Sequence, residues 1–242
     1  KGLTYQDAHD LMYNRNYFGV MMVETGDADG FLCGFATKYA DTIKPALQIV
    51  GTNNSLKHIA GMYIVMTKKG PFFFADTTVN IRPEARTIAD TTLLTANEVR
   101  KFNMVPKIAI VSYSNFGGVR DGSPARAKEA VEILHRDYPD LIVDGEMQAN
   151  YAFNKEMRMN KFPFTKLQDH DVNTIIFPNL SSGNIAYKMM QEIGEAEVIG
   201  PIMVGIRKPI HVMQMGSSVR EIENMAAIAV VDAQTTGKEI VQ

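Results

Sequence analysis

The feature that most constrains the fold of this chain is its alternation of short apolar runs with longer amphipathic stretches. The amphipathic stretches include 85–103 and 125–137, which have helical periodicity. The apolar runs indicate strands and lie at 30–36, 61–67, 71–76, 107–112, 141–143, 174–177, 200–206 and 210–213. Strands separated by helices of this length are typical of parallel sheets. We therefore predict an α/β fold with a mostly parallel sheet.

Local signals set several helix boundaries. Thr4 and Asp7 resemble a capping box at the start of a helix over 4–22. Pro45 favours a first helical turn for 41–50. Ser218 is a candidate N-cap for a helix over 218–233. The turn Lys68-Lys69-Gly70 predicts a hairpin between two apolar runs. The segment 154–170 is the least regular and is interpreted as a surface excursion.

Composition excludes several classes of function. The chain has 242 residues, a formal net charge of −2 and no basic run, so we predict no nucleic-acid partner. No apolar window approaches the ~18 residues of a membrane span, and no signal peptide opens the chain, so we expect a cytoplasmic protein without a membrane partner. The single cysteine, Cys33, excludes an intrachain disulfide and a cysteine-based zinc site, and is interpreted as a buried, inert thiol.

Three polar loops, 112–118, 144–148 and 179–184, each follow an apolar run. Ligands in open α/β sheets bind at the carboxyl ends of strands, where backbone amides and helix N-termini can hold phosphate. Three such loops in one chain indicate a phosphorylated ligand.

Two further features leave alternatives open. Asp144 and Glu146 could form a general base or a metal-ligand pair, or they could cap the following helix. We favour the cap because no histidine lies nearby in the sequence. The five histidines share no metal-ligand spacing, and we predict no metal site. His211 lies in the run 210–213, where we favour a packing role over a role in a cleft.

Several blocks together resemble the phosphate acetyl/butyryl transferase family, in order and over nearly the whole chain. The most specific are Asp-Gly-Glu-Met-Gln and Gly-Asn-Ile-Ala-Tyr-Lys. The matching blocks lie at 44–48, 112–118, 139–141 with 144–148, 177–188, and 200–202 with 208–210. The family's N-terminal part has no counterpart here, which fits the abrupt start at Lys1, and we expect the chain to be a fragment.

The resemblance implies acyl transfer between coenzyme A and phosphate. Active members place a Ser-Arg pair after the Lys-Pro-Ile block, an aspartate slightly downstream and an arginine before the Pro-x-Leu-Gln block. These positions hold Gln214 and Met215, Glu221, and Lys44 in this chain. We therefore expect no catalytic residues and little or no transacetylase turnover, since a thioether cannot neutralise a phosphoryl group.

The amino-acid sequences of 39–45 and 212–222 resemble the transacetylase-like domain that follows the catalytic half of NADP-dependent malic enzymes. This resemblance implies a non-catalytic regulatory domain that binds acetyl-CoA as effector and needs no cofactor of its own. NADP, Mg or Mn, and the oxidative decarboxylation of malate would belong to the malic-enzyme catalytic domain of the same parent chain. A homo-oligomer, at least a dimer, is expected.

By resemblance the fold has two lobes with a cleft between them. Residues 1–58 plus 193–242 would form lobe I, and 59–192 lobe II. The expected ligand-binding residues for CoA and phosphate are Thr42, Lys44, Ser112, Ser114, Asn115, Gly117, Gly118, Asn184, Gln214, Gly216 and Ser217. Two other functions stay open: an active phosphate acetyltransferase that uses Gln214, Lys44 and Glu221 as substitutes, and a structural oligomerisation module.

Overall fold

The computed structural model describes residues 2–35, 39–52 and 56–235, which form two compact units. The first unit contains Lys1–Lys57 and Gly200–Gln242, and the second contains His58–Ile199. This division differs from the expected lobes chiefly in 193–199, which lie in the second unit. No helix among the described residues is long and apolar enough to cross a membrane.

The second unit is built on a sheet with strand order β5-β4-β6-β3-β2-β7, whose last strand, β7, continues past Ile199 into residues assigned to the first unit. β2 and β3 form the expected antiparallel hairpin, while β3, β6, β4 and β5 run parallel. The sheet register pairs both Phe73 and Ile108 with Thr174, so the carboxyl ends of these strands meet at one edge. The strands are β2 Ala60–Thr67, β3 Gly70–Ala75, β4 Ile108–Val111, β5 Val143–Met147, β6 Thr174–Ile176 and β7 Glu197–Val204.

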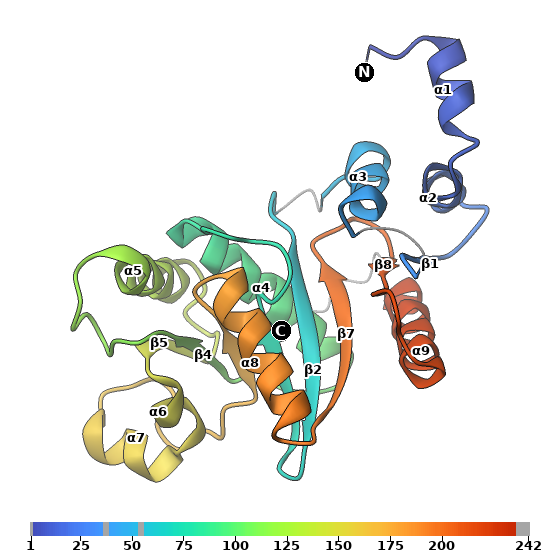
Figure 1. The fold of residues 1–242 in the computed structure, drawn as a ribbon. Helices are drawn as coiled ribbons and strands as arrows, with labels where there is room; N and C mark the ends of the chain where they lie inside the picture. The colour runs from blue at the N-terminus through green and yellow to red at the C-terminus, as the bar shows by residue number, and fades with distance from the viewer. Residues whose placement is uncertain (1, 36–38, 53–55, 236–242) are drawn as a thin grey trace. The chain divides into compact units, whose positions relative to one another are not determined.

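Helices cover both faces of this sheet (Figure 1). α4 contacts β2, β3 and β6, and α5 contacts α4 and β5. α8 contacts β2 and β3, and α6 contacts β4. The segment predicted to be irregular, 154–170, begins with a short helix that Asn154 caps. The helices are α4 Ala85–Lys101, α5 Gly122–Asp137, α6 Ala149–Phe153, α7 Lys155–Lys161 and α8 Leu180–Glu192.

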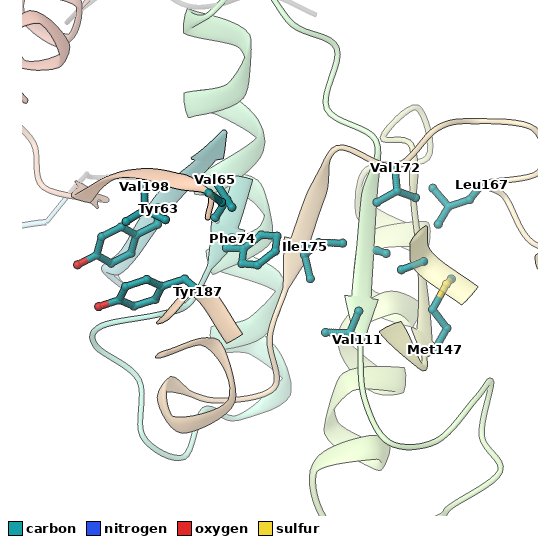
Figure 2. Packing of buried hydrophobic residues seen from close by; sticks show 13 residues of the cluster. Tyr63, Val65, Phe74, Val111, Met147, Leu167, Val172, Ile175, Tyr187 and Val198 are labelled. Carbon is teal, nitrogen blue, oxygen red and sulfur yellow. The ribbon is translucent and has the colours of Figure 1, made fainter. Parts of the chain in front are cut away.

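The hydrophobic core of the second unit lies between the sheet and α8 (Figure 2). Tyr63 of β2 stacks on Tyr187 of α8 with ring centroids 3.9 Å apart. Phe74 and Ile175 continue the same core along the sheet. Side chains of a strand alternate between its faces, so Met62 and Ile64 of β2 face the α4 side. Burial of both faces explains the near-continuous apolar character of these strands.

The first unit combines the two ends of the chain. Phe31–Cys33 of β1 pairs in parallel with Ile210–Val212 of β8. A small core packs Val20, Ala46, Val50 and Ile210 together. The helices of this unit are α1 Tyr5–Leu11, α2 Arg15–Thr25, α3 Tyr39–Ile49 and α9 Val219–Thr235.

Helix caps explain which predicted helix boundaries of this unit the structure confirms. Thr4 and Asp7 form the expected capping box, and Ser218 accepts from the Glu221 amide at the start of α9. The single helix expected over 4–22 is wrong, because Asn14 accepts from the amides of residues 16 and 17 and begins a second helix. Pro45 lies inside α3 and not in its first turn.

Candidate functional site

Three polar segments meet at the carboxyl edge of the parallel strands in the second unit. They follow β3 at 76–80, β4 at 112–118 and β6 at 177–184. The Phe177 amide donates to the Ala75 carbonyl at 2.6 Å, and the Leu180 amide donates to the Asn80 carbonyl at 2.8 Å. The segments after β3 and β6 are therefore joined by direct backbone hydrogen bonds.

Asp76 organises the segment after β3, which the sequence analysis did not single out. Its buried carboxylate accepts from the Gly61, Thr78 and Val79 amides at 2.9–3.1 Å and from the Asn80 amide at 2.6 Å. The signal was present in the sequence, since Asp-Thr-Thr-Val-Asn directly follows an apolar strand. Like the three predicted loops, this segment is polar and directly follows an apolar run.

The predicted loop 112–118 lies at the carboxyl end of β4, and its backbone is largely committed to the protein. The Phe116 amide donates to the Glu146 carbonyl at 2.7 Å, and the Gly117 amide donates to Glu146 Oε1 at 2.9 Å. The Gly118 amide donates to Asn115 O at 3.0 Å. These amides are not free to hold phosphate in this conformation, so an anion would need other donors.

Side chains of this loop supply some of those donors. Ser112 Oγ is buried without a partner among the described residues, and Ser114 is also buried. Lys128 of α5 reaches the loop, because a Cβ at Gly117 would lie 3.2 Å from its Nζ. Lys128 was not among the predicted site residues, because its proximity to the loop depends on how α5 packs and carries no local signal in the sequence. Asn115 Oδ1 accepts from the Gln148 amide at 2.9 Å.

The expected loop at 144–148 is wrong, because Asp144 and Glu146 lie inside strand β5. Asp144 Oδ2 accepts from Thr165 Oγ1 at 2.6 Å and from the Lys166 amide at 2.7 Å. Glu146 is fully buried and holds the loop 112–118 through the contacts above. Neither carboxylate caps a helix, and the residues described include no cluster of three or more metal-ligating groups.

The expected loop at 179–184 is an N-cap followed by the first turn of α8. Asn179 Oδ1 accepts from the Ser182 amide at 3.0 Å. Asn184 Nδ2 donates to the Thr77 carbonyl at 3.4 Å, which ties the helix to the segment after β3. Gly183 permits this approach, since a Cβ there would lie 2.2 Å from the Asp76 carbonyl oxygen. Asn184 is therefore at the predicted edge, with its amide used within the protein.

The remaining expected ligand residues lie in the first unit. Thr42 on α3 is fully buried, 3.5 Å from Asn16 Nδ2, whereas Lys44 is exposed. Gln214 and Gly216 are exposed in the turn before α9, where Ser217 Oγ donates to the Gln214 carbonyl at 2.9 Å. The expected set therefore divides into two groups, one in each unit.

The segment that departs from the family's pattern is shaped by the start of α9. Met215 is 70% exposed. Glu221 Oε2 accepts from the Ser218 amide at 2.6 Å, which completes a capping box with the Ser218 hydroxyl. Glu221 thus serves the helix terminus, as an acid at the third helical position commonly does.

His211 is fully buried in β8 and belongs to the packing of the first unit. Its Nδ1 accepts from the Met203 amide at 3.3 Å, and its Nε2 lies 2.8 Å from Asp232 Oδ2 of α9. An acceptor at Nδ1 assigns the proton to Nε2, where it faces the carboxylate. The packing interpretation of His211 is confirmed.

Comparisons with known proteins agree with this architecture. The family model for phosphate acetyl/butaryl transferase matches residues 1–230. The phosphate acetyltransferase of Bacillus subtilis (strain 168) is 34% identical, over 95% of this chain and 71% of that protein. The phosphotransacetylase structure from Streptococcus pyogenes superposes with a TM-score of 0.91 and 37% identity, covering 96% of this chain and 70% of that one.

A second group of relatives consists of longer proteins. The NADP-dependent malic enzyme of Escherichia coli (strain K12) is 33% identical over 97% of this chain, which spans only 31% of that enzyme. Both relatives match nearly the whole chain, and the residues matched by the family model, 1–230, include parts of both units. The chain belongs to the phosphate acetyl/butaryl transferase family.

Proposed function

We propose that this chain binds an acyl-CoA without transferring its acyl group, as a regulatory part of an NADP-dependent malic enzyme. The observation that carries the proposal is Met215, an exposed thioether at the position where the resemblance places an arginine. A thioether has neither charge nor an N–H donor. When the CoA thiol attacks the acetyl carbonyl of acetyl phosphate, the negative charge that develops on the departing phosphate would meet no fixed cation at this position.

The magnitude of this loss supports a binding role. Removal of one transition-state donor commonly costs about 3–4 kcal/mol, or a factor of about 100–1000 in rate. Lys44 retains a charge where the resemblance places a second arginine, but it lacks the planar, bidentate fork. Ground-state binding depends on many contacts and tolerates the loss of one, whereas the chemical step depends on the few that strengthen in the transition state.

The malic-enzyme setting is supported by the 33% identity with the Escherichia coli enzyme over 97% of this chain. This chain spans 31% of the Escherichia coli protein, so most of that protein lies outside the matched region. In such a setting NADP, Mg or Mn, and malate would bind to the remaining part. Acetyl-CoA would regulate only by binding one of two states of a homo-oligomer more tightly, since equal affinity for both states shifts nothing.

A second candidate is an active phosphate acetyltransferase, which the TM-score of 0.91 with a phosphotransacetylase favours. In that case Gln214 would supply the hydrogen-bond donor, Lys44 the cation and Glu221 the base. The carboxylate of Glu221 already accepts from the Ser218 amide, and use of this oxygen as a base would give up that helix-capping bond.

One experiment separates these candidates. The chain is mixed with acetyl phosphate and CoA, thioester absorbance is followed, and acetyl-CoA binding is measured by calorimetry. We expect binding without turnover. We also expect Met215→Arg to raise the rate at least about tenfold, whereas Met189→Arg, the same exchange at another exposed methionine, does not.

Two outcomes contradict the proposal. Turnover of the unmodified chain at about 1–1000 per second, the usual range for enzymes, would establish the second candidate. If acetyl-CoA produces no heat of binding and no thermal shift, both ligand-binding candidates are eliminated and the oligomerisation module remains.

A further inference from the structure

A cavity of about 370 Å³ opens at the edge of the sheet opposite to the candidate site. Lys69 and Pro71 flank the start of β3, Met104 precedes β4, and Asn173 directly precedes β6. The candidate site follows the carboxyl ends of these same strands, so the two lie at opposite ends of β3, β4 and β6. Cavities of about 300–1000 Å³ are typical of small-molecule sites.

Arg158 of α7 lines this cavity and is fully buried. Its Nη1 donates to the carbonyls of Tyr151 and Ala152 at 3.0 and 2.9 Å, and its Nη2 donates to the His170 carbonyl at 2.5 Å. These acceptors are neutral, and Arg158 forms no ion pair within the described ranges. Its Nε–H is buried without an acceptor there. The guanidinium is thus a buried cation that no carboxylate contacts directly among the described residues.

The other charged groups of the cavity are mostly positive. Lys69 and Lys155 line it and enter no ion pair with the described residues, and Asp171 is the one carboxylate in the lining. Asp171 partly offsets the effect of burial, which lowers the pKa of Arg158. Three cations against one carboxylate leave an excess of two positive charges, which favours an anionic ligand.

The rest of the lining is apolar and partly aromatic. Phe72 and Phe153 meet edge to face with centroids 5.4 Å apart, and Met104 and Val172 lie beside them. Phe153 is 44% exposed, although it is a large apolar side chain. A ligand with an apolar body would cover this surface and gain by its removal from water.

We infer that this cavity binds a small organic carboxylate with a compact apolar body, at a site separate from the acyl-CoA site. The carboxylate would lie towards Arg158, Lys69 and Lys155, and the body against Phe72 and Phe153. A negatively charged ligand is favoured, because the carbonyls that hydrogen-bond to the guanidinium are neutral and Asp171 is the one carboxylate against three cations in the lining.

The test uses calorimetry on the whole chain with phenylacetate, its neutral analogue phenylacetamide, and inorganic phosphate. We expect phenylacetate to bind more tightly than either of the others, and to bind equally well when acetyl-CoA is saturating. Lys155→Gln and Lys69→Gln should each weaken phenylacetate about two- to fivefold. Lys161→Gln, on the same helix as Lys155 but outside the cavity, should leave binding unchanged.

Arg158 itself stays intact in this test, because it also ties α6 to the turn at 168–170 and its loss could unfold the unit. The inference is overturned by no heat with phenylacetate up to about 10 mM. Equal binding of phenylacetamide would show that charge does not contribute, and equal binding of phosphate would show that the apolar body does not contribute. Competition with acetyl-CoA would show that the two ligands share one site.

Discussion

Substitution of Asp76 by alanine should destabilise the second unit strongly, because this carboxylate holds the segment after β3 together. Its Oδ1 accepts from the Gly61, Thr78 and Val79 amides, and its Oδ2 accepts from the Asn80 amide and side chain. Alanine would leave all of these donors without the acceptor.

The expected magnitude follows from the burial of the donors. Gly61 is buried, so its amide should bear the full cost of an unsatisfied donor, about 1–3 kcal/mol. Residues 78–80 are half-buried, so water can replace the carboxylate and each amide should lose about 0.5–1 kcal/mol. We therefore expect Asp76→Ala to lower the free energy of unfolding by about 2.5–6 kcal/mol.

Urea unfolding followed by circular dichroism measures this change. Asp76→Asn keeps one oxygen but turns an NH₂ group towards the Asn80 donors, so its loss should be smaller, about 1–3 kcal/mol. Asp140→Ala, at an exposed aspartate, should stay within about 0.5 kcal/mol of the unmodified chain. A loss below about 1.5 kcal/mol for Asp76→Ala would refute the reasoning, because the amides would then have found other acceptors.

Three other predictions concern single side chains. Burial raises the pKa of the Cys33 thiol to about 12, so a disulfide reagent at pH 8 should label the native chain far more slowly than the urea-unfolded chain; equal rates would contradict this. The hydrogen bond from Arg207 lowers the pKa of Glu24 below 4.5, so Glu24→Gln should lower the free energy of unfolding by roughly 1 kcal/mol at pH 7. This difference between the two chains should vanish as the pH falls through the lowered pKa. An undiminished difference in unfolding free energy at pH 3 would disprove the assignment. Tyr187→Phe removes a buried hydroxyl without a partner among the described residues, so urea unfolding should show equal or greater stability, and a loss above about 1 kcal/mol would reveal a missed partner.

The parts of the fold that follow from the sequence depend on local patterns. The hairpin at Lys68–Gly70, the capping box at Thr4 and the N-cap at Ser218 need only neighbouring residues, and the structure confirms them. The α/β class needs only the alternation of apolar runs with helical stretches. Where the sequence carried a competing cap, as at Asn14, the longer helix that was predicted is divided.

The carboxylates of β5 could not be placed from their neighbours alone. Asp144 and Glu146 are polar residues in a buried strand, and each accepts a hydrogen bond from a residue far along the chain: Thr165 for Asp144 and Gly117 for Glu146. A local pattern shows the cost of burying such groups but not the partners that offset it. The prediction therefore ended the strand at 143, four residues early.

The same contacts bear on where function can vary within this family. Asp76 and Glu146 stand at the carboxyl edge, yet each uses its carboxylate on backbone amides and shapes the segments there. If either carboxylate were replaced, these backbone amides would lose their acceptor and the loop would lose its conformation. Gain or loss of chemistry is therefore expected in the turn at Gln214 and Met215, where both residues are exposed to solvent. An enzyme and a binding module can then share both units and differ in a few exposed side chains, which explains why fold similarity alone does not separate the two candidate functions.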